Sequence, residues 1–510
     1  MAVKIILLLV FFAIMSAGGV YSRKKATNVN DFVLGGRSVG PWMTAFAFGT
    51  SYFSSVVFVG YAGQFGWKYG LASTWIGLGN AFIGSLLAWV ILGRRTRVMS
   101  QKLESATMPD FFGKRYDSKA LKLVASAICF VFLIPYTASI YNGLSRLFAM
   151  AFDIPYSACI ITMAVLTGVY VILGGYMATA INDFIQGIIM LIGIVAVIVA
   201  VLNGHGGFYE AIFQLAELES DVAVTMGQKG VFTSFFGPDV VNLIGVVVLT
   251  SLGTWGLPQM VHKFYAIKDE RAVKTGTVVS TIFAIIISGG CYFLGGFARL
   301  YADADIYKAD GSVMYDAIVP AMLSTLPDIL IGIVIVLVLS ASMSTLSSLV
   351  LTSSSTLTLD FIKGTIVKDM KEKTQLIVMR VLIAFFIILS VVIALNPPTF
   401  IAQLMGISWG ALAGAFLAPF MYGLYSKKVT KAAVWASFVV GVGLTVSNMF
   451  FKFIASPINA GAIAMVASLI VVPIVSLITP KMKQETVDEI FTCYDQKVTV
   501  TEKTSLGENA

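Results

Sequence analysis

The clearest candidate for chemistry is a cluster of hydroxyl side chains in residues 341–355, ASMSTLSSLVLTSSS, at the end of a strongly apolar run. On a helix, the residues that fall on or beside one face are Ala341, Ser344, Thr345, Ser347 and Ser348. Hydroxyl oxygens that cluster inside a bilayer can replace the water shell of a small hard cation, and polar groups at that depth are functional candidates. A simpler interpretation is close helix packing, with each hydroxyl bonded to the preceding turn.

Two apolar stretches are interrupted by residues that weaken a helix: GTSYFSS at 49–55 and TSLGTWGLPQ at 250–259. Unsatisfied backbone is very costly in lipid, so such breaks persist only where protein or a water-filled cavity covers them. If the break near Thr50 faces Ser344 and Thr345, a cation meets carbonyl and hydroxyl oxygens that are all neutral. This set favours Na⁺ over Ca²⁺ or Mg²⁺, which usually require carboxylates. The alternative is two ordinary kinked helices.

Asp183 is the one acidic residue that the sequence places near the membrane, at the cytoplasmic start of an apolar run. Three roles are open for its carboxylate. It can compensate a second cation together with Ser347 and Ser348, it can carry a proton, or it can cap a helix N-terminus in Asn182-Asp183.

The composition indicates that the elements holding these residues are membrane helices. Hydrophobic residues make up 57% of the 510 residues and charged residues only 12%, against about 25% charged in an ordinary soluble domain. The net charge of +8 follows from short loops between spans and does not indicate a nucleic-acid partner. Two histidines and four scattered cysteines predict neither a metal centre nor a disulfide framework, and we expect no enzyme activity and no organic cofactor.

We predict an all-α polytopic membrane protein with about thirteen spans. The run from Ile5 to Val20 is preceded only by Lys4 and followed by Arg23-Lys24-Lys25, which favours a retained span over a signal peptide. The further spans lie at about 41–63, 72–93, 121–149, 156–174, 182–203, 239–257, 275–300, 328–352, 376–395, 399–424, 431–453 and 460–479. Each is near the roughly 20 residues that cross hydrocarbon.

The loop charges predict the orientation. With the N-terminus outside, lysine and arginine gather in the cytoplasmic loops, for example Arg94 to Arg97 and Lys427-Lys428, with Lys263 counted among them. A miscounted span would invert this bias for everything after it, so the bias favours an odd number of spans with a cytoplasmic C-terminus.

The breaks also predict how the spans are organised. Residues 1–480 form one transmembrane domain: 1–22 are an extra N-terminal span, 41–203 and 239–424 are two five-helix repeats, and 431–479 are two extra spans. Residues 481–510 are a short cytoplasmic tail. A broken helix opening each of two equivalent halves is typical of an inverted-repeat secondary transporter with its site at the midplane.

Four segments carry a resemblance to a known family: FVLGGRSVG at 32–40, MPDFFGKRY at 108–116, GGYMATAINDFIQG at 174–187 and ASMSTLSS at 341–348. With these motifs the chain resembles the sodium:solute symporter family, whose members carry proline, pantothenate, monocarboxylates, sugars or sialic acid. The resemblance covers essentially the whole chain. It implies a five-plus-five fold of the leucine-transporter type, with Na⁺ as the coupling ion and a small organic solute moved into the cell.

The resemblance also implies residue roles. A sodium site would consist of Thr50, Phe53, Ala341, Ser344 and Thr345, and a possible second site of Asp183, Ser347 and Ser348. Solute would lie against Ser51, Tyr52, Ser54, Tyr136, Trp255, Pro258 and Gln259. We expect a protein of the cell membrane that works as a monomer, with the solute, Na⁺ and the lipid bilayer as its partners.

The solute is the least determined feature. Proline carriers have an acid in the first break, where this chain has Tyr52, and aromatic residues before the second, where it has Thr250 and Thr254. Four runs resemble pantothenate and monocarboxylate carriers more closely: SYFSS, WKYGL, NDFIQGIIMLIG and GLPQMVHKFYAIKDERAVKTG. This resemblance favours a small carboxylate, with an amino acid such as proline as the second candidate. The alternatives are a proton-coupled carrier that uses Asp183 and a sodium-coupled sugar carrier. A channel is disfavoured, because paired broken helices indicate alternating access.

Overall fold

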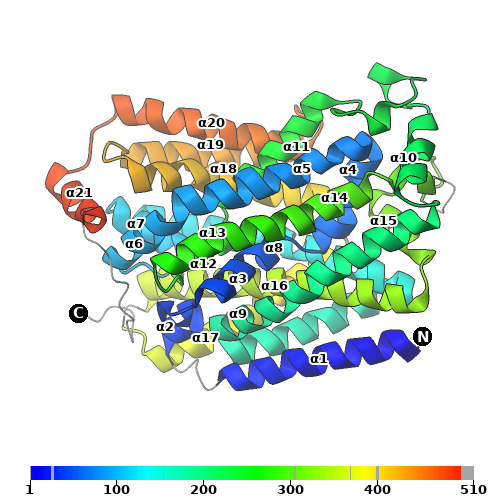
Figure 1. The fold of residues 1–510 in the computed structure, drawn as a ribbon. Helices are drawn as coiled ribbons and strands as arrows, with labels where there is room; N and C mark the ends of the chain where they lie inside the picture. The colour runs from blue at the N-terminus through cyan, green and yellow to red at the C-terminus, as the bar shows by residue number, and fades with distance from the viewer. Residues whose placement is uncertain are drawn as a thin grey trace.

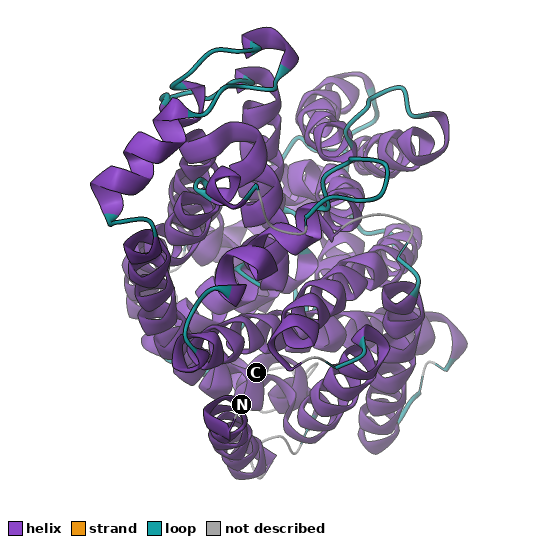
Figure 2. Cartoon of the chain, turned by 90° about the vertical axis from the view of Figure 1, so that its right-hand side faces the viewer, coloured by secondary structure: helices purple, strands orange, loops and turns teal. Residues whose placement is uncertain are grey.

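The computed structural model describes residues 2–23, 28–152, 154–302, 306–367, 369–397 and 401–495. Apart from two isolated β-bridges, the regular structure of this part of the chain is helical. The long helices run side by side in one bundle (Figure 1), and a view along the bundle shows them nearly end-on (Figure 2). The start of α1 and helix α21 lie at opposite ends of the bundle.

The helices of the N-terminal part are α1 (Ala2–Arg23), α2 (Val29–Leu34), α3 (Pro41–Tyr52), α4 (Ala62–Tyr69), α5 (Thr74–Gly79), α6 (Arg94–Lys102), α7 (Met108–Arg115), α8 (Lys119–Phe152), α9 (Tyr156–Gly204) and α10 (Phe208–Glu217). Those of the C-terminal part are α11 (Val240–Leu252), α12 (Pro258–Tyr265), α13 (Glu270–Ala284), α14 (Gly290–Gly295), α15 (Tyr315–Ser324), α16 (Asp328–Thr356), α17 (Glu372–Leu395), α18 (Ile401–Tyr425), α19 (Lys431–Phe451), α20 (Pro457–Ile478) and α21 (Gln484–Phe491). Wider helical turns continue several of them: Val56–Tyr61, Asn80–Leu87, Trp89–Gly93, Ile285–Gly289 and Leu357–Ile366.

Within the described residues, nine helical runs are long and apolar enough to cross a membrane, and the bent pair α11–α12 makes ten. Two shorter apolar segments, Ala2–Met15 and Tyr156–Val169, accompany them. One run, Val56–Lys102, has 47 residues, more than twice the roughly 20 that a crossing needs. Its backbone turns at Gly70, which has a φ of 60°, between two of the predicted spans. The exact number of thirteen spans stays a prediction.

Both predicted helix breaks are confirmed. Helix α3 ends at Tyr52, and Phe53 is extended, with φ −113° and ψ 119°. The helix restarts after Ser54, whose Oγ accepts a hydrogen bond of 3.2 Å from the Val56 amide. The second break separates α11 from α12 by a bend of 40°. Helix α12 begins at Pro258. The backbone N–H groups of a first helical turn have no partner within the helix, so proline, which lacks this group, is well suited to that position.

Helix α9 is two helices joined at Gly175, which has φ 56° and ψ −158°. A Cβ at this position would lie 2.9 Å from the Phe32 carbonyl oxygen, so only glycine fits the close approach. The second segment therefore begins at Gly175 rather than near residue 182, and Asp183 lies two turns inside it. The expectation that Asp183 caps a helix N-terminus is wrong.

The N-terminal helix α1 packs against the bundle. Its Lys4 Nζ donates to the Ala151 carbonyl at 3.1 Å and lies 3.0 Å from Asp328 Oδ1. The Asn182 side-chain amide donates to the Met15 carbonyl at 3.3 Å. Helix α21 of the predicted tail lies at the opposite end, where Lys427 Nζ contacts Asp488 Oδ1 at 2.7 Å. The tail after residue 495 is outside the described residues.

Helix α16 lies at the centre of the bundle and contacts α3, α8, α9 and α12. Every residue of α16 from Val338 to Thr356 is buried. Its hydroxyl face is thus enclosed by neighbouring helices instead of facing lipid. The core that packs around it brings the two broken helices against one another, since α12 contacts both α3 and α16.

Candidate functional site

The break in α3 faces the hydroxyl groups of α16. Ser344 Oγ donates to Thr50 Oγ1 at 2.9 Å. Thr345 Oγ1 lies 3.1 Å from the Ala341 carbonyl of its own helix. It also lies 3.3 Å from the Ser51 carbonyl and 3.5 Å from the Thr50 carbonyl of α3. These residues, almost 300 positions apart in sequence, form one cluster of buried oxygen atoms.

Phe53 completes the set of residues predicted for the first ion site. Its extended backbone is the place where α3 stops being helical. Phe53 and Ala341 line the same small cavity of about 10 Å³, roughly the size that one water molecule occupies. The other side chains of this cavity are mainly apolar. Hydrogen bonds join Thr50, Ala341, Ser344 and Thr345, and Phe53 lies at the break that follows Thr50.

The oxygen atoms that these hydrogen bonds join are hydroxyls and backbone carbonyls, and the nearby carboxylate of Asp183 interacts with the Ser344 hydroxyl. Neutral oxygens bind a monovalent hard cation and still let it leave, whereas a divalent ion usually needs carboxylate ligands. A helix that ends in mid-bundle also leaves carbonyl groups without helical partners. The donor set fits Na⁺ as a transported ion.

A charged group lies next to this neutral cluster. Lys263 Nζ on α12 donates to Ser348 Oγ at 2.9 Å and lies 3.5 Å from Asp183 Oδ2. Both charged residues are buried. Ser348 Oγ in turn lies 2.9 Å from Ser51 Oγ in the α3 break. Ser347 bonds back to the Ser344 carbonyl at 2.8 Å.

The position of Lys263 corrects the sequence analysis, which counted it as a cytoplasmic loop charge. The residue is on α12, the second half of the broken helix, and is only 1% exposed. A signal was present: Gln259 and Lys263 are four residues apart, which places both side chains on one face of the helix that Pro258 begins.

Two of the residues predicted to contact solute form an aromatic cluster. Tyr52 and Tyr136 both pack on Trp409 of α18, with ring centroids 6.3 and 5.8 Å away. The Tyr52 hydroxyl donates to the Thr250 carbonyl at 2.6 Å, joining the two breaks. Sequence reasoning missed Trp409, whose only signal is an aromatic ring in a buried, glycine-rich span.

The other predicted solute residues differ in what their side chains do. Ser51 bonds to Ser348, Ser54 supports the restart of the helix, and Trp255 Nε1 donates to the Ile83 carbonyl at 3.0 Å. Pro258 is the first residue of α12. Gln259 is 1% exposed, and within the described residues neither atom of its side-chain amide has a hydrogen-bond partner. It has unused hydrogen-bonding capacity at the second break.

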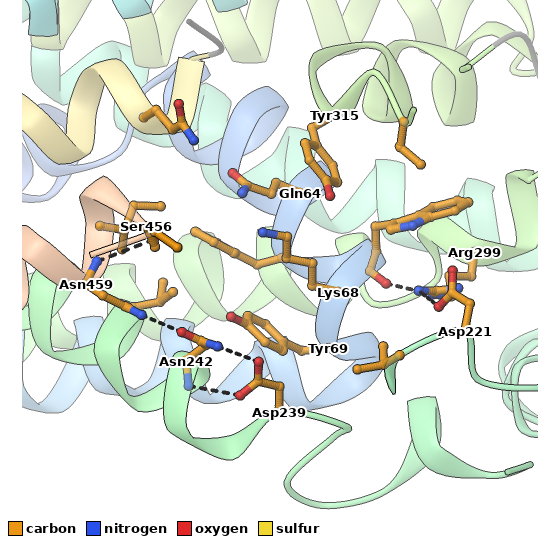
Figure 3. Close-up of a pocket in the computed structure, with 18 of the residues that line it drawn as sticks. Gln64, Lys68, Tyr69, Asp221, Asp239, Asn242, Arg299, Tyr315, Ser456 and Asn459 are labelled. Carbon is orange, nitrogen blue, oxygen red and sulfur yellow. Dashed lines mark hydrogen bonds and ion pairs between the residues drawn. The ribbon is translucent and has the colours of Figure 1, made fainter. Parts of the chain in front are cut away.

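A cavity of about 560 Å³, lined by both polar and apolar side chains, opens at the end of the bundle beyond the α3 break (Figure 3). Gln64 and Lys68 of α4 line one wall, and Asn242 of α11 lines another. Asn459 of α20 donates to Asn242, whose amides donate to Asp239. This cavity was not predicted. It joins polar residues of α4 and α11, the halves of the two broken helices that lie at this end of the bundle.

Comparisons with known proteins agree with this geometry. A model of the sodium:solute symporter family matches residues 32–441. The osmoregulated proline transporter OpuE of Bacillus subtilis is 28% identical over 447 residues, covering 86% of this chain and 88% of that protein. A sodium/proline symporter of Staphylococcus aureus is 30% identical over 449 residues, covering 86% and 84%. The chain belongs to the sodium:solute symporter family, and is therefore a multi-pass membrane transporter.

The fold is also that of solved transporters. A Na⁺-coupled sialic acid symporter in a substrate-bound, outward-open state superposes with a TM-score of 0.77 at 19% identity, covering 94% of this chain and 98% of that one. Mhp1, a nucleobase-cation-symport-1 family transporter in a closed conformation, gives 0.54 at 12% identity, covering 91% and 98%. The fold is the five-plus-five leucine-transporter type with broken helices.

Proposed function

We propose that this protein couples the movement of Na⁺ into the cell to the uptake of a small organic solute. Na⁺ would bind the oxygen atoms of Thr50, Phe53, Ala341, Ser344 and Thr345. The observation that carries this proposal is the meeting of the Ser344 and Thr345 hydroxyls with the broken end of α3. A cation bound there holds α16 and α3 together, which links ion occupancy to the arrangement of the two helices.

Sodium coupling supplies enough free energy for nutrient uptake. One charge that crosses 100 mV contributes about 2.3 kcal/mol, and a tenfold Na⁺ gradient adds about 1.4 kcal/mol. Their sum corresponds to a solute gradient of roughly several hundredfold for one ion per neutral solute.

For the solute we propose L-proline or a small carboxylate of similar size. The relatives named above support proline. Tyr52, Tyr136 and Trp409 offer an aromatic surface for a small apolar body, and the Gln259 amide offers polar contacts. The remaining members of the proposed solute set are Ser51, Ser54, Trp255 and Pro258.

We further propose that the N-terminus is outside, that the C-terminus is cytoplasmic and that one chain is sufficient for transport. The loop charges support the orientation. In this orientation the cavity of Figure 3 faces the outside and forms the entry vestibule. The two repeats would be residues 41–203 and 239–424, with 1–22 and 431–479 as additions.

The test is uptake into proteoliposomes that contain the purified full-length chain. The solute panel is L-proline, pantothenate, pyruvate, lactate, acetate and a hexose, each with an inward Na⁺ gradient, with K⁺ replacing Na⁺, and with a proton gradient alone. We expect saturable uptake of proline or one of the carboxylates only with Na⁺. Uptake driven by protons without Na⁺ would establish the alternative that uses Asp183, and uptake of the hexose alone would establish a sugar carrier.

A further inference from the structure

The second predicted ion site, made of Asp183, Ser347 and Ser348, already contains a positive charge. Lys263 Nζ lies 3.5 Å from Asp183 Oδ2 and donates to Ser348 Oγ at 2.9 Å. The ammonium also lies over the ring of Tyr176, 5.1 Å from its centroid. Lys263 is 1% exposed and Asp183 is fully buried. The lysine is thus held from three sides in the place that a cation at Asp183 would take.

The buried charges at this place balance without a metal ion. Asp183 carries one negative charge and Lys263 one positive charge, so the pair is neutral. A Na⁺ added between Asp183 and Ser348 would stand next to the ammonium and leave the buried group with a net positive charge. Like charges at such short distance repel strongly where water is excluded.

The ammonium is also close to the first ion site. Ser344 and Ser348 are one helical turn apart, about 6 Å along the axis of α16. Ser348 is joined to the α3 break through Ser51, at 2.9 Å. The Lys263 charge is therefore connected by hydrogen bonds to the same broken helix that meets Ser344 and Thr345.

We infer that Lys263 serves as a built-in cation at the second site, so that the protein binds and carries a single Na⁺ in each cycle. Lys263 then determines the ion stoichiometry. This inference rests on the proposed sodium coupling and adds that the chain itself provides the partner of Asp183. Removing the ammonium leaves Asp183 and Ser348 open to a second Na⁺.

The test is equilibrium binding of ²²Na⁺ to the purified full-length protein, which does not require the solute to be known. We expect one Na⁺ per chain in the unmodified protein and two in Lys263→Met, a change that keeps the length of the side chain and removes its charge. Lys263→Arg should still bind one. The matched control is Lys4→Met, which removes another buried lysine that is paired with an aspartate and should leave one Na⁺ per chain.

A second readout is the ratio of ²²Na⁺ to L-proline, or to whichever solute of the panel is carried, in proteoliposome uptake. Two Na⁺ per chain or per solute in the unmodified protein overturns the inference while leaving sodium coupling intact, and this result does not depend on any variant folding. One Na⁺ in both the unmodified protein and a folded Lys263→Met also overturns it. No Na⁺ binding at all would overturn the proposed function itself.

Discussion

Two successive turns of α16 present the same kind of side chain to very different surroundings. The turn with Ser344 and Thr345 meets the hydroxyl and carbonyl oxygens of the broken helix α3. The next turn, with Ser348, meets the ammonium of Lys263 and, beyond it, the carboxylate of Asp183. Both turns are buried and rich in hydroxyls, and Ser348 also contacts Ser51 of the α3 break. The difference is the ammonium of Lys263, which donates to the second turn.

This contrast separates an exchangeable site from a permanent one. Neutral oxygens attract a cation weakly enough for it to be released, which a carrier requires. A buried carboxylate needs a counter-charge at all times, because an unpaired buried charge is strongly destabilising. In this structure Lys263, which is tethered to the chain, supplies that counter-charge at 3.5 Å. The first turn is thus suited to transport and the second to holding the helices together.

The largest expected effect is on the permanent site. Asp183→Asn leaves the Lys263 ammonium buried without its counter-charge, and we expect a loss of stability of about 3 kcal/mol or more. The measurement is thermal unfolding of the purified protein in detergent. The double variant Asp183→Asn with Lys263→Met should recover much of the loss, since it removes both charges together.

Equal melting temperatures for Asp183→Asn and the unmodified protein would show that the two charges do not depend on one another. Asp183 and Lys263 would then not form the stabilising charge pair by which the second turn is distinguished from the first.

The next effect concerns the exchangeable site. Replacing both Ser344 and Thr345 by alanine removes two oxygen ligands, each contributing about 1 kcal/mol, so Na⁺ affinity should fall roughly thirtyfold. Sodium-stimulated uptake should be lost at ordinary Na⁺ concentrations while the protein still inserts into the membrane. The measurement is uptake as a function of external Na⁺.

Ser353→Ala is the matched control for this double variant. Ser353 is a buried serine on the same helix, and its hydroxyl has no hydrogen-bond partner in the described part of the chain. It should leave the Na⁺ dependence unchanged. An unchanged Na⁺ dependence in the Ser344 and Thr345 double variant would contradict the assignment of the ion site.

The smallest effect is expected at the link between the two sites. Ser348→Ala removes the hydrogen bonds to Lys263 and Ser51 but leaves the ion pair and the ligands of the first turn. We expect a loss of stability of about 1 kcal/mol and a change in Na⁺ affinity of a few fold at most. A loss of Na⁺ binding as large as that of the double variant would show that the two turns form one site.

Much of this architecture could be predicted because it depends on local patterns. Long apolar runs predict the spans, and Gly49, Ser54 and Pro258 mark breaks that the structure contains at 53–54 and before 258. The five residues proposed for the first ion site were predicted from a helical face and family motifs. In the structure hydrogen bonds join four of them, and Phe53 lies at the break that follows Thr50. Their role in binding Na⁺ stays a prediction for the experiments above.

Other features could not be predicted, because they depend on where a helix ends or on what packs against it. Gly175 lets the second segment of α9 start several residues early, which carries Asp183 from a helix end into the bundle. Lys263 looks like a loop charge because it follows the proline break and precedes a charged stretch. Trp409 contacts Tyr52 and Tyr136 only through the packing of α18.

The amino-acid sequence by itself determined that this is a helical membrane transporter with two interrupted spans and a buried row of hydroxyls. Hydropathy and helix-breaking residues influence only the few residues next to them in the chain, so their effects can be predicted from local sequence. Only the tertiary structure decided which group neutralises Asp183 and which turn of α16 meets the free carbonyls. Electrostatic and coordinating contacts act over a few ångströms in space, between residues that are 80 to almost 300 positions apart in the chain.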